Sequence, residues 1–118
     1  MSNYKTTKTF EDRENESKEI ITKYPNRIPL IIEKLSNKND GIIPNIDKNK
    51  YLVPDDLTVG QLMYVIRKRL KLTPEKAIFI FCNGSILNSN STMRSVYDNY
   101  KDKDGFVYII YSGESTFG

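Results

Sequence analysis

Residues 50–70 read KYLVPDDLTVGQLMYVIRKRL, in which a β-prone run is followed directly by a helix signal. Pro54 closes the run, and a proline at the end of a strand is typical of a sheet edge because it has no N–H to donate. Thr58 and Gln61 have the spacing of a capping box, in which each side chain binds the other residue's backbone N–H. Apolar residues then recur at helical spacing up to Leu70. The stretch therefore predicts an edge strand, a turn and a capped amphipathic helix.

Three further stretches of the sequence predict strands. Residues 28–34 and residues 106–111 are rich in Ile, Val, Tyr and Phe, which are frequent in strands. Residues 77–82 form a third run of this kind, and it ends at Asn83-Gly84, a dipeptide typical of a tight turn. Together with the edge strand, these runs predict a sheet of four strands.

The N-terminal part of the chain is predicted to be helical. A helix is expected from Phe10 to Tyr24, because a capping signal stands at Thr9 and Pro25 cannot continue a helix. A weaker helical turn is expected just before it, at residues 4–8.

The predicted order is helix, strand, strand, helix, strand, short helix, strand, with Ser91 or Thr92 as the cap of the short helix. From the first strand onward, this is the order of the ubiquitin β-grasp. Three of the four strands are apolar on both faces, so both faces of the sheet need a cover. The helix that follows Thr58 covers one face, and the N-terminal helix is the remaining large element for the other.

These elements predict one α+β domain with three parts. Residues 1–27 form an N-terminal helical extension packed on the sheet. Residues 28–111 form a ubiquitin-like β-grasp core, and residues 112–118 form a flexible C-terminal tail.

The composition argues against several classes of function. Without histidine, and with Cys82 as its single cysteine, the chain cannot build a Ser-His-Asp or Cys-His nucleophile or a zinc site. No P-loop or Rossmann glycine pattern is present. We therefore expect no enzymatic activity, no metal and no cofactor. A net charge of +3 is small, and the basic cluster at residues 67–71 suits the C-terminal end of a helix, so no nucleic-acid partner is expected.

The sequence also indicates a compartment. No apolar run approaches the roughly 20 residues that are needed to cross a bilayer. One cysteine cannot form an internal disulfide, which suits a reducing, cytoplasmic setting.

Gly118 is the last residue of the sequence, at the end of a polar tail that follows the last predicted strand. Because glycine has no Cβ, an activated glycyl ester or thioester is open to attack by an amine, and the tail can enter a narrow channel. At about 3.3 Å per residue, residues 112–118 span roughly 20 Å. The alternative is a frayed terminus in which the glycine has no role.

Several strings of the sequence resemble the autophagy-related ubiquitin-like modifiers. The resemblance runs from about Phe10 to the last residue and is strongest with the founding autophagosomal branch of the family, the one nearer the GABA-receptor-associated proteins. The strings are YPNRIP at 24–29, IDKNKYLVPDDLTVGQ at 46–61, VIRKR at 65–69, PEKAIFIF at 74–81, KDKDGF at 101–106, YSGE at 111–114 and TFG at 116–118.

The resemblance implies a modifier that is joined through Gly118 to phosphatidylethanolamine on the growing autophagosome. In the family, an activating enzyme adenylates the glycine and takes it as a thioester, and a conjugating enzyme passes it to the lipid amine. A cysteine protease trims precursors and releases the lipidated form. Thr116 and Phe117 match tail positions that these enzymes recognise. The resemblance implies a cytoplasmic monomer that moves to autophagosome and vesicle membranes when lipidated.

The resemblance also implies peptide binding at the edge strand. The family captures short motifs of autophagy receptors and scaffolds, in which an aromatic residue is followed three positions later by an aliphatic one. An exposed edge accepts an added strand, while pockets select alternate side chains. By position, the aromatic pocket (the aromatic set) comprises Glu16, Ile20, Pro29, Ile31, Lys50, Leu52 and Phe106. The aliphatic pocket (the aliphatic set) comprises Tyr51, Val53, Pro54, Leu57, Leu62 and Val65. Arg27 and Lys48 form a charged rim, and a second binding face is expected at Phe79, Ile80 and Phe81.

Some of these positions have a competing interpretation. Core packing explains Pro29, Ile31 and Phe106 about equally well, and it explains residues 79–81 better than a binding face does. Leu62 stands where many members of the family carry Phe, and the loop at residues 36–43 is longer than usual.

Two other functions are considered. One is a ubiquitin-like adaptor in vesicle trafficking that is never conjugated. The other is a sulfur carrier, but such proteins usually end in Gly-Gly, which Phe117-Gly118 does not match.

Overall fold

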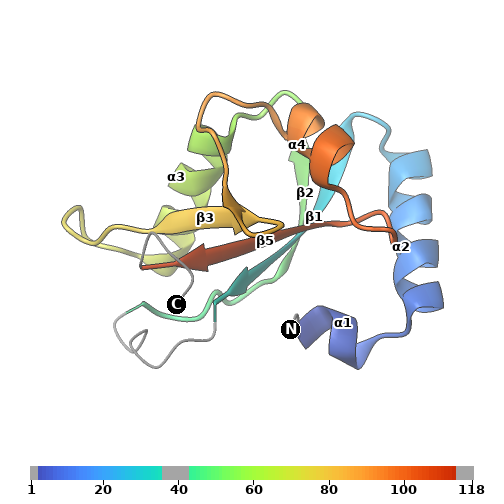
Figure 1. The fold of residues 1–118 in the computed structure, drawn as a ribbon, viewed down its shortest axis with the longest axis horizontal. Helices are drawn as coiled ribbons and strands as arrows, with labels where there is room; N and C mark the ends of the chain where they lie inside the picture. Colours follow the sequence, from blue (N-terminus) through green and yellow to red (C-terminus); the bar gives the residue numbers. More distant parts are fainter. Residues whose placement is uncertain (1–2, 36–42, 114–118) are drawn as a thin grey trace.

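The computed structural model describes residues 3–35 and 43–113, and Figure 1 shows its architecture. Over these residues the chain forms a mixed sheet of five strands with helices on both faces. The sheet order is β2-β1-β5-β3-β4, in which β1 and β5 are parallel and the other pairs are antiparallel. The elements are α1 (Asn3–Thr7), α2 (Phe10–Lys23), β1 (Arg27–Lys34), β2 (Lys50–Pro54), α3 (Val59–Leu70), β3 (Phe79–Cys82), β4 (Ser85–Ile86), α4 (Met93–Tyr100) and β5 (Val107–Ser112).

The helix ends agree with the capping signals of the sequence. Thr58 and Gln61 form a complete capping box at the start of α3. Thr9 and Thr92 each accept a hydrogen bond from a backbone N–H in the first turn of α2 and α4, respectively. α3 ends at Leu70, and the capping residue Lys71 that follows it adopts a left-handed conformation with φ of 56°. The helices predicted at these places are therefore confirmed.

The strands differ from the prediction in three respects. The third strand begins at Phe79 rather than two residues earlier, because the pairing of β3 with β5 among the described residues begins with Phe79 opposite Ser112. The chain then turns at Asn83-Gly84, both with positive φ, into β4. β4 was not predicted, since two residues are too short for an alternating pattern. The last strand is shifted by one residue, since β5 begins at Val107 rather than Phe106 and includes Ser112, which was expected to begin the tail.

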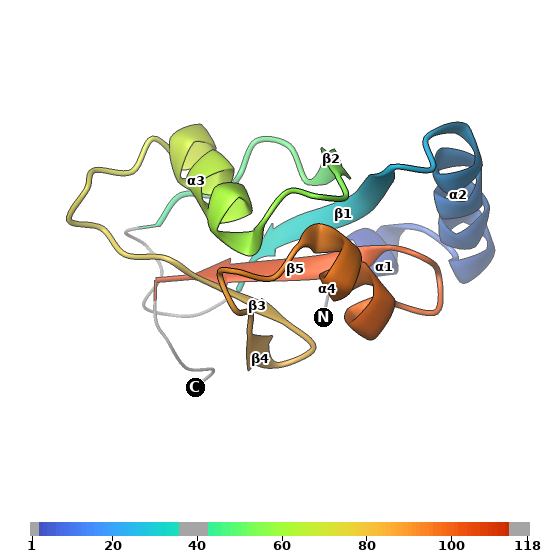
Figure 2. The same ribbon diagram turned by 90° about the horizontal axis from the view of Figure 1, so that it is seen from above.

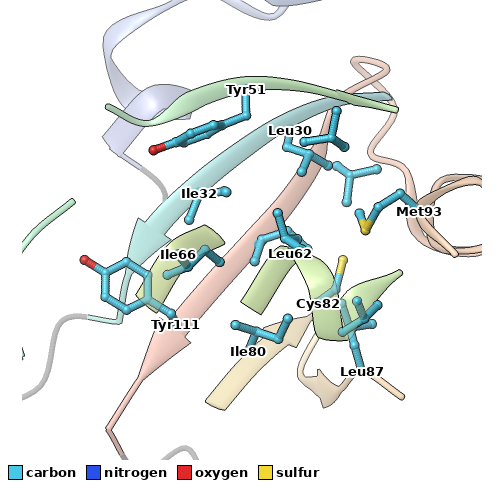
Figure 3. Packing of buried hydrophobic residues seen from close by; sticks show 14 of the residues in the cluster. Leu30, Ile32, Tyr51, Leu62, Ile66, Ile80, Cys82, Leu87, Met93 and Tyr111 are labelled. Atoms are coloured by element: carbon cyan, nitrogen blue, oxygen red, sulfur yellow. The ribbon is translucent and has the colours of Figure 1, made fainter. Parts of the chain in front are cut away.

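The larger core lies between the sheet and α3 (Figure 3). On β1, Ile28, Leu30 and Ile32 point to this side, where they meet Leu62 and Ile66 of α3. All five side chains are fully or almost fully buried.

A smaller core covers the opposite face of the sheet. It joins Tyr4 of α1 to Ile31 of β1 and to Phe106, with Ile20 and Tyr108 packed against it. Figures 1 and 2 show α1 and α2 together at the end of the molecule away from α3. The N-terminal helices therefore pack on the sheet, which confirms the expected extension of the ubiquitin-like core.

A buried ion pair fastens α2 to the turn before β5. The guanidinium of Arg13 lies 2.6 Å from Oδ2 of Asp104, whose side chain is completely buried. Asp104 also accepts hydrogen bonds from the hydroxyl of Tyr108 at 2.5 Å and from the backbone N–H of Phe106 at 2.9 Å. Ser17 of α2 donates to the backbone carbonyl of Asp104. Asp104 is thus the centre of a polar network inside the molecule.

No helix in the described part of the chain is both long and apolar enough to cross a membrane. The thiol of Cys82 lies in the core, where burial raises its pKa to about 11. It therefore remains protonated at neutral pH.

Candidate functional site

β2 lies at an edge of the sheet, as Pro54 predicted. In the described residues, its ladder partner is β1, in a register that runs from Arg27 opposite Pro54 to Ile31 opposite Lys50. Within residues 3–35 and 43–113, the other side of β2 has no ladder partner for its backbone N–H and C=O groups, and such groups can pair with an added strand. This free edge has α2 on one face of the sheet and α3 on the other (Figure 2).

The structure brings the aromatic set together on the face that α1 and α2 cover. Ile31 and Phe106 belong to the smaller core with no measurable exposure, and Pro29 is buried as well. Leu52 lies directly opposite Pro29 and is half-buried. The other half-buried members, Glu16, Ile20 and Lys50, complete the rim. The buried members thus form a floor, and the half-buried ones remain accessible from β2.

Tyr4 is a member of this region that the sequence did not indicate. The ring of Tyr4 packs edge-on against that of Phe106, with the two ring centroids 5.4 Å apart. The ammonium of Lys50 also lies 5.4 Å from the centroid of the Tyr4 ring. The hydroxyl of Tyr4 donates to Glu16, and burial together with that hydrogen bond raises the pKa of Tyr4. The short helical turn around Tyr4 carries no periodic pattern, so its sequence gave no signal for this contact.

Glu16 is held by three groups at the rim of the aromatic set. Its carboxylate accepts from Lys50 and from the hydroxyl of Tyr4, and the ammonium of Lys8 lies 3.6 Å away. Partial burial raises the pKa of Glu16, but the hydrogen bonds from Lys50 and Tyr4 outweigh it, so the pKa is lowered overall. Glu16 therefore stays ionised, and it fixes the position of the Lys50 ammonium at the start of the edge strand β2.

Stability is expected to fall in acid, partly through two carboxylates of the N-terminal layer. The pKa of Glu16 lies below its ordinary value of 4.5. The pKa of Asp102 lies below 3.8, because hydrogen bonds from Lys5, at 2.6 Å, and from the backbone of Asp104 outweigh the effect of burial. Groups with lowered pKa stabilise the folded state above their ordinary pKa, and this contribution is lost as the pH falls through the folded value.

Urea unfolding at pH 7 and pH 3 checks this expectation with Glu16→Gln. At pH 7 the variant should lose about 0.5–1 kcal/mol relative to the wild type, as for a partly exposed ion pair, and at pH 3 the difference should shrink. Glu19→Gln, at an exposed position of α2, is the control and should behave as wild type at both pH values. A constant difference for Glu16→Gln would contradict the assignment.

The aliphatic set lies on the other face of β2, toward α3. Tyr51 and Val53 belong to the larger core, and Leu57 packs against it. Leu62 has no exposed surface, so it lies beneath the other members. Val65 lies outside the row of apolar residues that α3 buries in the core, and it is 38% exposed. The last member, Pro54, is exposed at the end of the strand.

Two cations lie over Tyr51. The ammonium of Lys48 is 5.3 Å from the ring centroid, and the guanidinium of Arg69 is 5.6 Å from it. Arg69 in turn pairs with Asp47 at 3.2 Å. Burial raises the pKa of Tyr51, whose buried hydroxyl has no hydrogen-bond partner among the described residues. Arg69 and Asp47 were not predicted here, because they are 22 residues apart in the sequence.

The charged rim is divided between the two ends of β2. Lys48 precedes the strand, whereas Arg27 lies opposite its last residue and donates to the carbonyl of Leu52 at 3.4 Å. An acidic peptide laid along β2 would therefore meet a cation at each end.

The three residues that were expected to form a second binding face, Phe79, Ile80 and Phe81, do not lie on one face of the sheet. Successive residues of a strand point to opposite faces, and Ile80 belongs to the core beneath α3. Phe79 and Phe81 point the other way, and Ile86 opposite Phe81 is 54% exposed. Ile80 therefore does not join Phe79 and Phe81 on one surface. Thr116, Phe117 and Gly118, the predicted tail positions, lie outside the described residues.

A β-grasp sheet, a free edge strand flanked by two helices and an N-terminal helical layer define a ubiquitin-like protein with a helical extension. Residues 12–118 match the family model described as "Autophagy protein Atg8 ubiquitin like". The chain belongs to this family.

Similar proteins support the assignment over nearly the whole chain. Autophagy-related protein 8 of Vanderwaltozyma polyspora is 57% identical over 99% of this chain and 97% of its own length. Autophagy-related protein 8e of Arabidopsis thaliana is 56% identical over 98% of this chain and 92% of its own length. The crystal structure of Trypanosoma brucei ATG8 has a TM-score of 0.88 and 45% identity, and the match covers 100% of this chain and 99% of that one.

A further solved structure contains a partner. Plasmodium falciparum Atg8, in complex with a Plasmodium falciparum Atg3 peptide, matches with a TM-score of 0.88 and 34% identity. The match covers 99% of this chain and 100% of that one. These relatives give the present chain the role of an autophagy-related ubiquitin-like modifier.

Proposed function

We propose that this modifier is conjugated through Gly118 to phosphatidylethanolamine of autophagosomal membranes and that the free edge of β2 binds receptor and scaffold peptides. The observation that carries the peptide-binding part is an unpaired edge strand with the aromatic set on one face and the aliphatic set on the other. The match to the family through residue 118 supports the conjugation part.

The conjugation requires partners that activate the glycine. An activating enzyme would use ATP to form the acyl-adenylate of Gly118, releasing pyrophosphate, and an enzyme thiol would displace AMP to give a thioester. A conjugating enzyme would accept the acyl group on its own thiol, and the lipid amine would displace that thiol to form an amide. Thr116 and Phe117 would guide the tail into these enzymes and into the cysteine protease that trims and releases it. Two acyl chains are enough to hold a protein stably at a membrane.

Peptide binding would add a strand to β2. The backbone of the peptide would pair with the free edge, and alternate side chains would enter the aromatic and aliphatic sets. Lys48 and Lys50 would attract acidic residues that precede the aromatic one. The complex of the Plasmodium falciparum protein suggests the conjugating enzyme as one source of such a peptide.

A reconstituted conjugation reaction tests the proposal. The chain is incubated with cognate activating and conjugating enzymes, ATP and liposomes that contain phosphatidylethanolamine, and a faster-migrating lipidated band is expected on gels. Reactions without ATP, or with phosphatidylcholine liposomes, should not form it. A chain that binds peptides but never forms the band with active enzymes would instead be a non-conjugated adaptor.

Leu52→Ala is expected to weaken the binding of an aromatic-x-x-aliphatic peptide about five- to tenfold, as for the loss of about 1–1.4 kcal/mol when a contact residue at the centre of an interface is truncated. Leu52 is half-buried on β2, so the fold should persist and conjugation should continue. Isothermal titration calorimetry measures the affinity, and circular dichroism checks the fold. Ile86→Ala, at the opposite edge of the sheet, is the matched control. Loss of binding in the control alone would move the site to the face of Phe79 and Phe81.

A further inference from the structure

The loop between α3 and β3 carries an exposed threonine directly before a proline. Residues 73–76 read TPEK, and of the five prolines in the sequence Pro74 alone follows a serine or threonine. Each of these four residues is exposed. Figures 1 and 2 both show the loop projecting from the body of the molecule, at the end away from α2. The side chain of Thr73 is therefore accessible to another protein.

Local hydrogen bonds shape residues 73–76 into a turn. The N–H of Lys76 donates to the carbonyl of Thr73 at 3.0 Å, and Pro74 occupies the second position, where a proline presets the backbone. Arg67, in the last turn of α3, donates to the carbonyls of Thr73 at 3.0 Å and of Lys76 at 2.5 Å. The turn accounts for Pro74, whereas these bonds use the backbone, and not the side chains, of Thr73 and Lys76.

An exposed hydroxyl followed by a proline, with a lysine two positions beyond the proline, is the arrangement that proline-directed protein kinases recognise. A proline has no N–H, so a kinase pocket that offers no acceptor at this position takes it without leaving a buried donor unpaired. The lysine supplies a positive charge for an anionic group of the kinase. Thr73, Pro74 and Lys76 provide these three groups in the required order.

The turn can open for a kinase while the core stays folded. A kinase binds its substrate as an extended segment, so the three hydrogen bonds of the turn must break, at about 0.5–1.5 kcal/mol each. The sum is below the roughly 5–15 kcal/mol that unfold a typical domain. Local opening of a surface loop is therefore the less costly event.

We propose that Thr73 is phosphorylated by a proline-directed kinase and that Arg67 receives the phosphate. Oγ1 of Thr73 would attack the γ-phosphorus of ATP, and the bond from that phosphorus to the β–γ bridging oxygen would break. ADP would leave, and the hydroxyl proton would pass to a carboxylate of the kinase. The inference depends neither on conjugation through Gly118 nor on peptide binding at β2.

The surroundings of Thr73 favour a phosphate. Nη2 of Arg67 lies 3.0 Å from the carbonyl oxygen of Thr73, so a phosphate on the same residue is within reach of the guanidinium. A guanidinium has five N–H groups, more than the two bonds to the turn require. Residues 67–76 contain five basic residues and one acidic residue, which gives a net charge of +4. A phosphate of about −1.5 to −2 would roughly halve that charge.

Phosphorylation of the full chain in vitro tests the site. The chain is incubated with a cyclin-dependent kinase, ATP and Mg²⁺, and tandem mass spectrometry is expected to locate the phosphate on Thr73. Pro74→Ala should lower the initial rate about tenfold or more, as for a group that a pocket selects. Lys76→Ala should lower it about two- to fivefold, as for an exposed charge pair. Pro44→Ala, at an exposed proline that follows isoleucine, is the matched control and should not change the rate.

Phosphorus-31 NMR of the modified chain tests the role of Arg67. The second ionisation of phosphothreonine has a pKa of about 6, and a neighbouring guanidinium favours the dianion. The titration midpoint should therefore lie about 0.5 pH unit lower in the wild type than in Arg67→Met. Arg67→Lys keeps the charge and should retain part of the difference. Lys68→Met, which removes an exposed charge from the next residue, is the control and should titrate like the wild type.

The outcomes are distinct for the site and for its receiver. If the chain stays unmodified, the proposal fails, and modification of a synthetic peptide of residues 68–80 would then identify the folded turn as the obstacle. A phosphate found on another residue would also overturn it. If Thr73 is modified but the wild type and Arg67→Met titrate alike, the site stands and the pairing with Arg67 is refuted.

Discussion

Asp104→Ala is expected to lower the free energy of unfolding by about 3–5 kcal/mol, the usual cost of removing one partner from a buried ion pair. The substitution would leave the guanidinium of Arg13 inside the protein without its carboxylate, and the hydroxyl of Tyr108 and the N–H of Phe106 without their acceptor. Urea denaturation followed by circular dichroism measures the loss.

Two controls identify the cause of that loss. Asp98→Ala removes a carboxylate from an exposed position of α4 and should change stability by less than about 0.5 kcal/mol. Combining Asp104→Ala with Arg13→Met removes the stranded charge, so the double variant should be more stable than Asp104→Ala alone. A double variant that is less stable than the single one would mean that the ion pair is not the source of the effect.

Gly118→Ala is expected to abolish lipidation in the reconstituted reaction. A methyl group next to the activated carbonyl hinders the approach of the lipid amine and widens the tail where it enters an active site. The lipidated band should disappear from gels, while the affinity for an aromatic-x-x-aliphatic peptide should be unchanged. Ser115→Ala, in the same tail, is the control and should be lipidated. A band of normal intensity with Gly118→Ala would show that the acyl bond is made elsewhere.

Local chemistry explains what could be predicted from the sequence. The capping box at Thr58 and Gln61 fixed the start of α3, because both of its hydrogen bonds join residues three positions apart. Pro54 indicated the sheet edge through its missing N–H. The assignment of Tyr51 and Leu52 to different pockets came from the resemblance to the family, and the alternation of side chains along β2 agrees with it, with Tyr51 toward α3 and Leu52 toward α2.

Long-range contacts account for what the sequence did not indicate. The ion pair of Arg13 and Asp104 joins residues 91 positions apart, and neither residue type predicts a buried position. Tyr4 meets Phe106 only because the sheet brings the N-terminal turn beside the start of β5.

The central place of β5 has a consequence for how the protein is made. β5 lies between β1 and β3, yet it is the last of the described strands to be synthesised. A nascent chain that lacks β5 has two separate half-sheets with exposed apolar edges, and such species are prone to aggregate. The ribosome must therefore release β5 before a stable domain can close, so premature stop codons even a few residues upstream of Ser112 should yield products that cellular proteases remove.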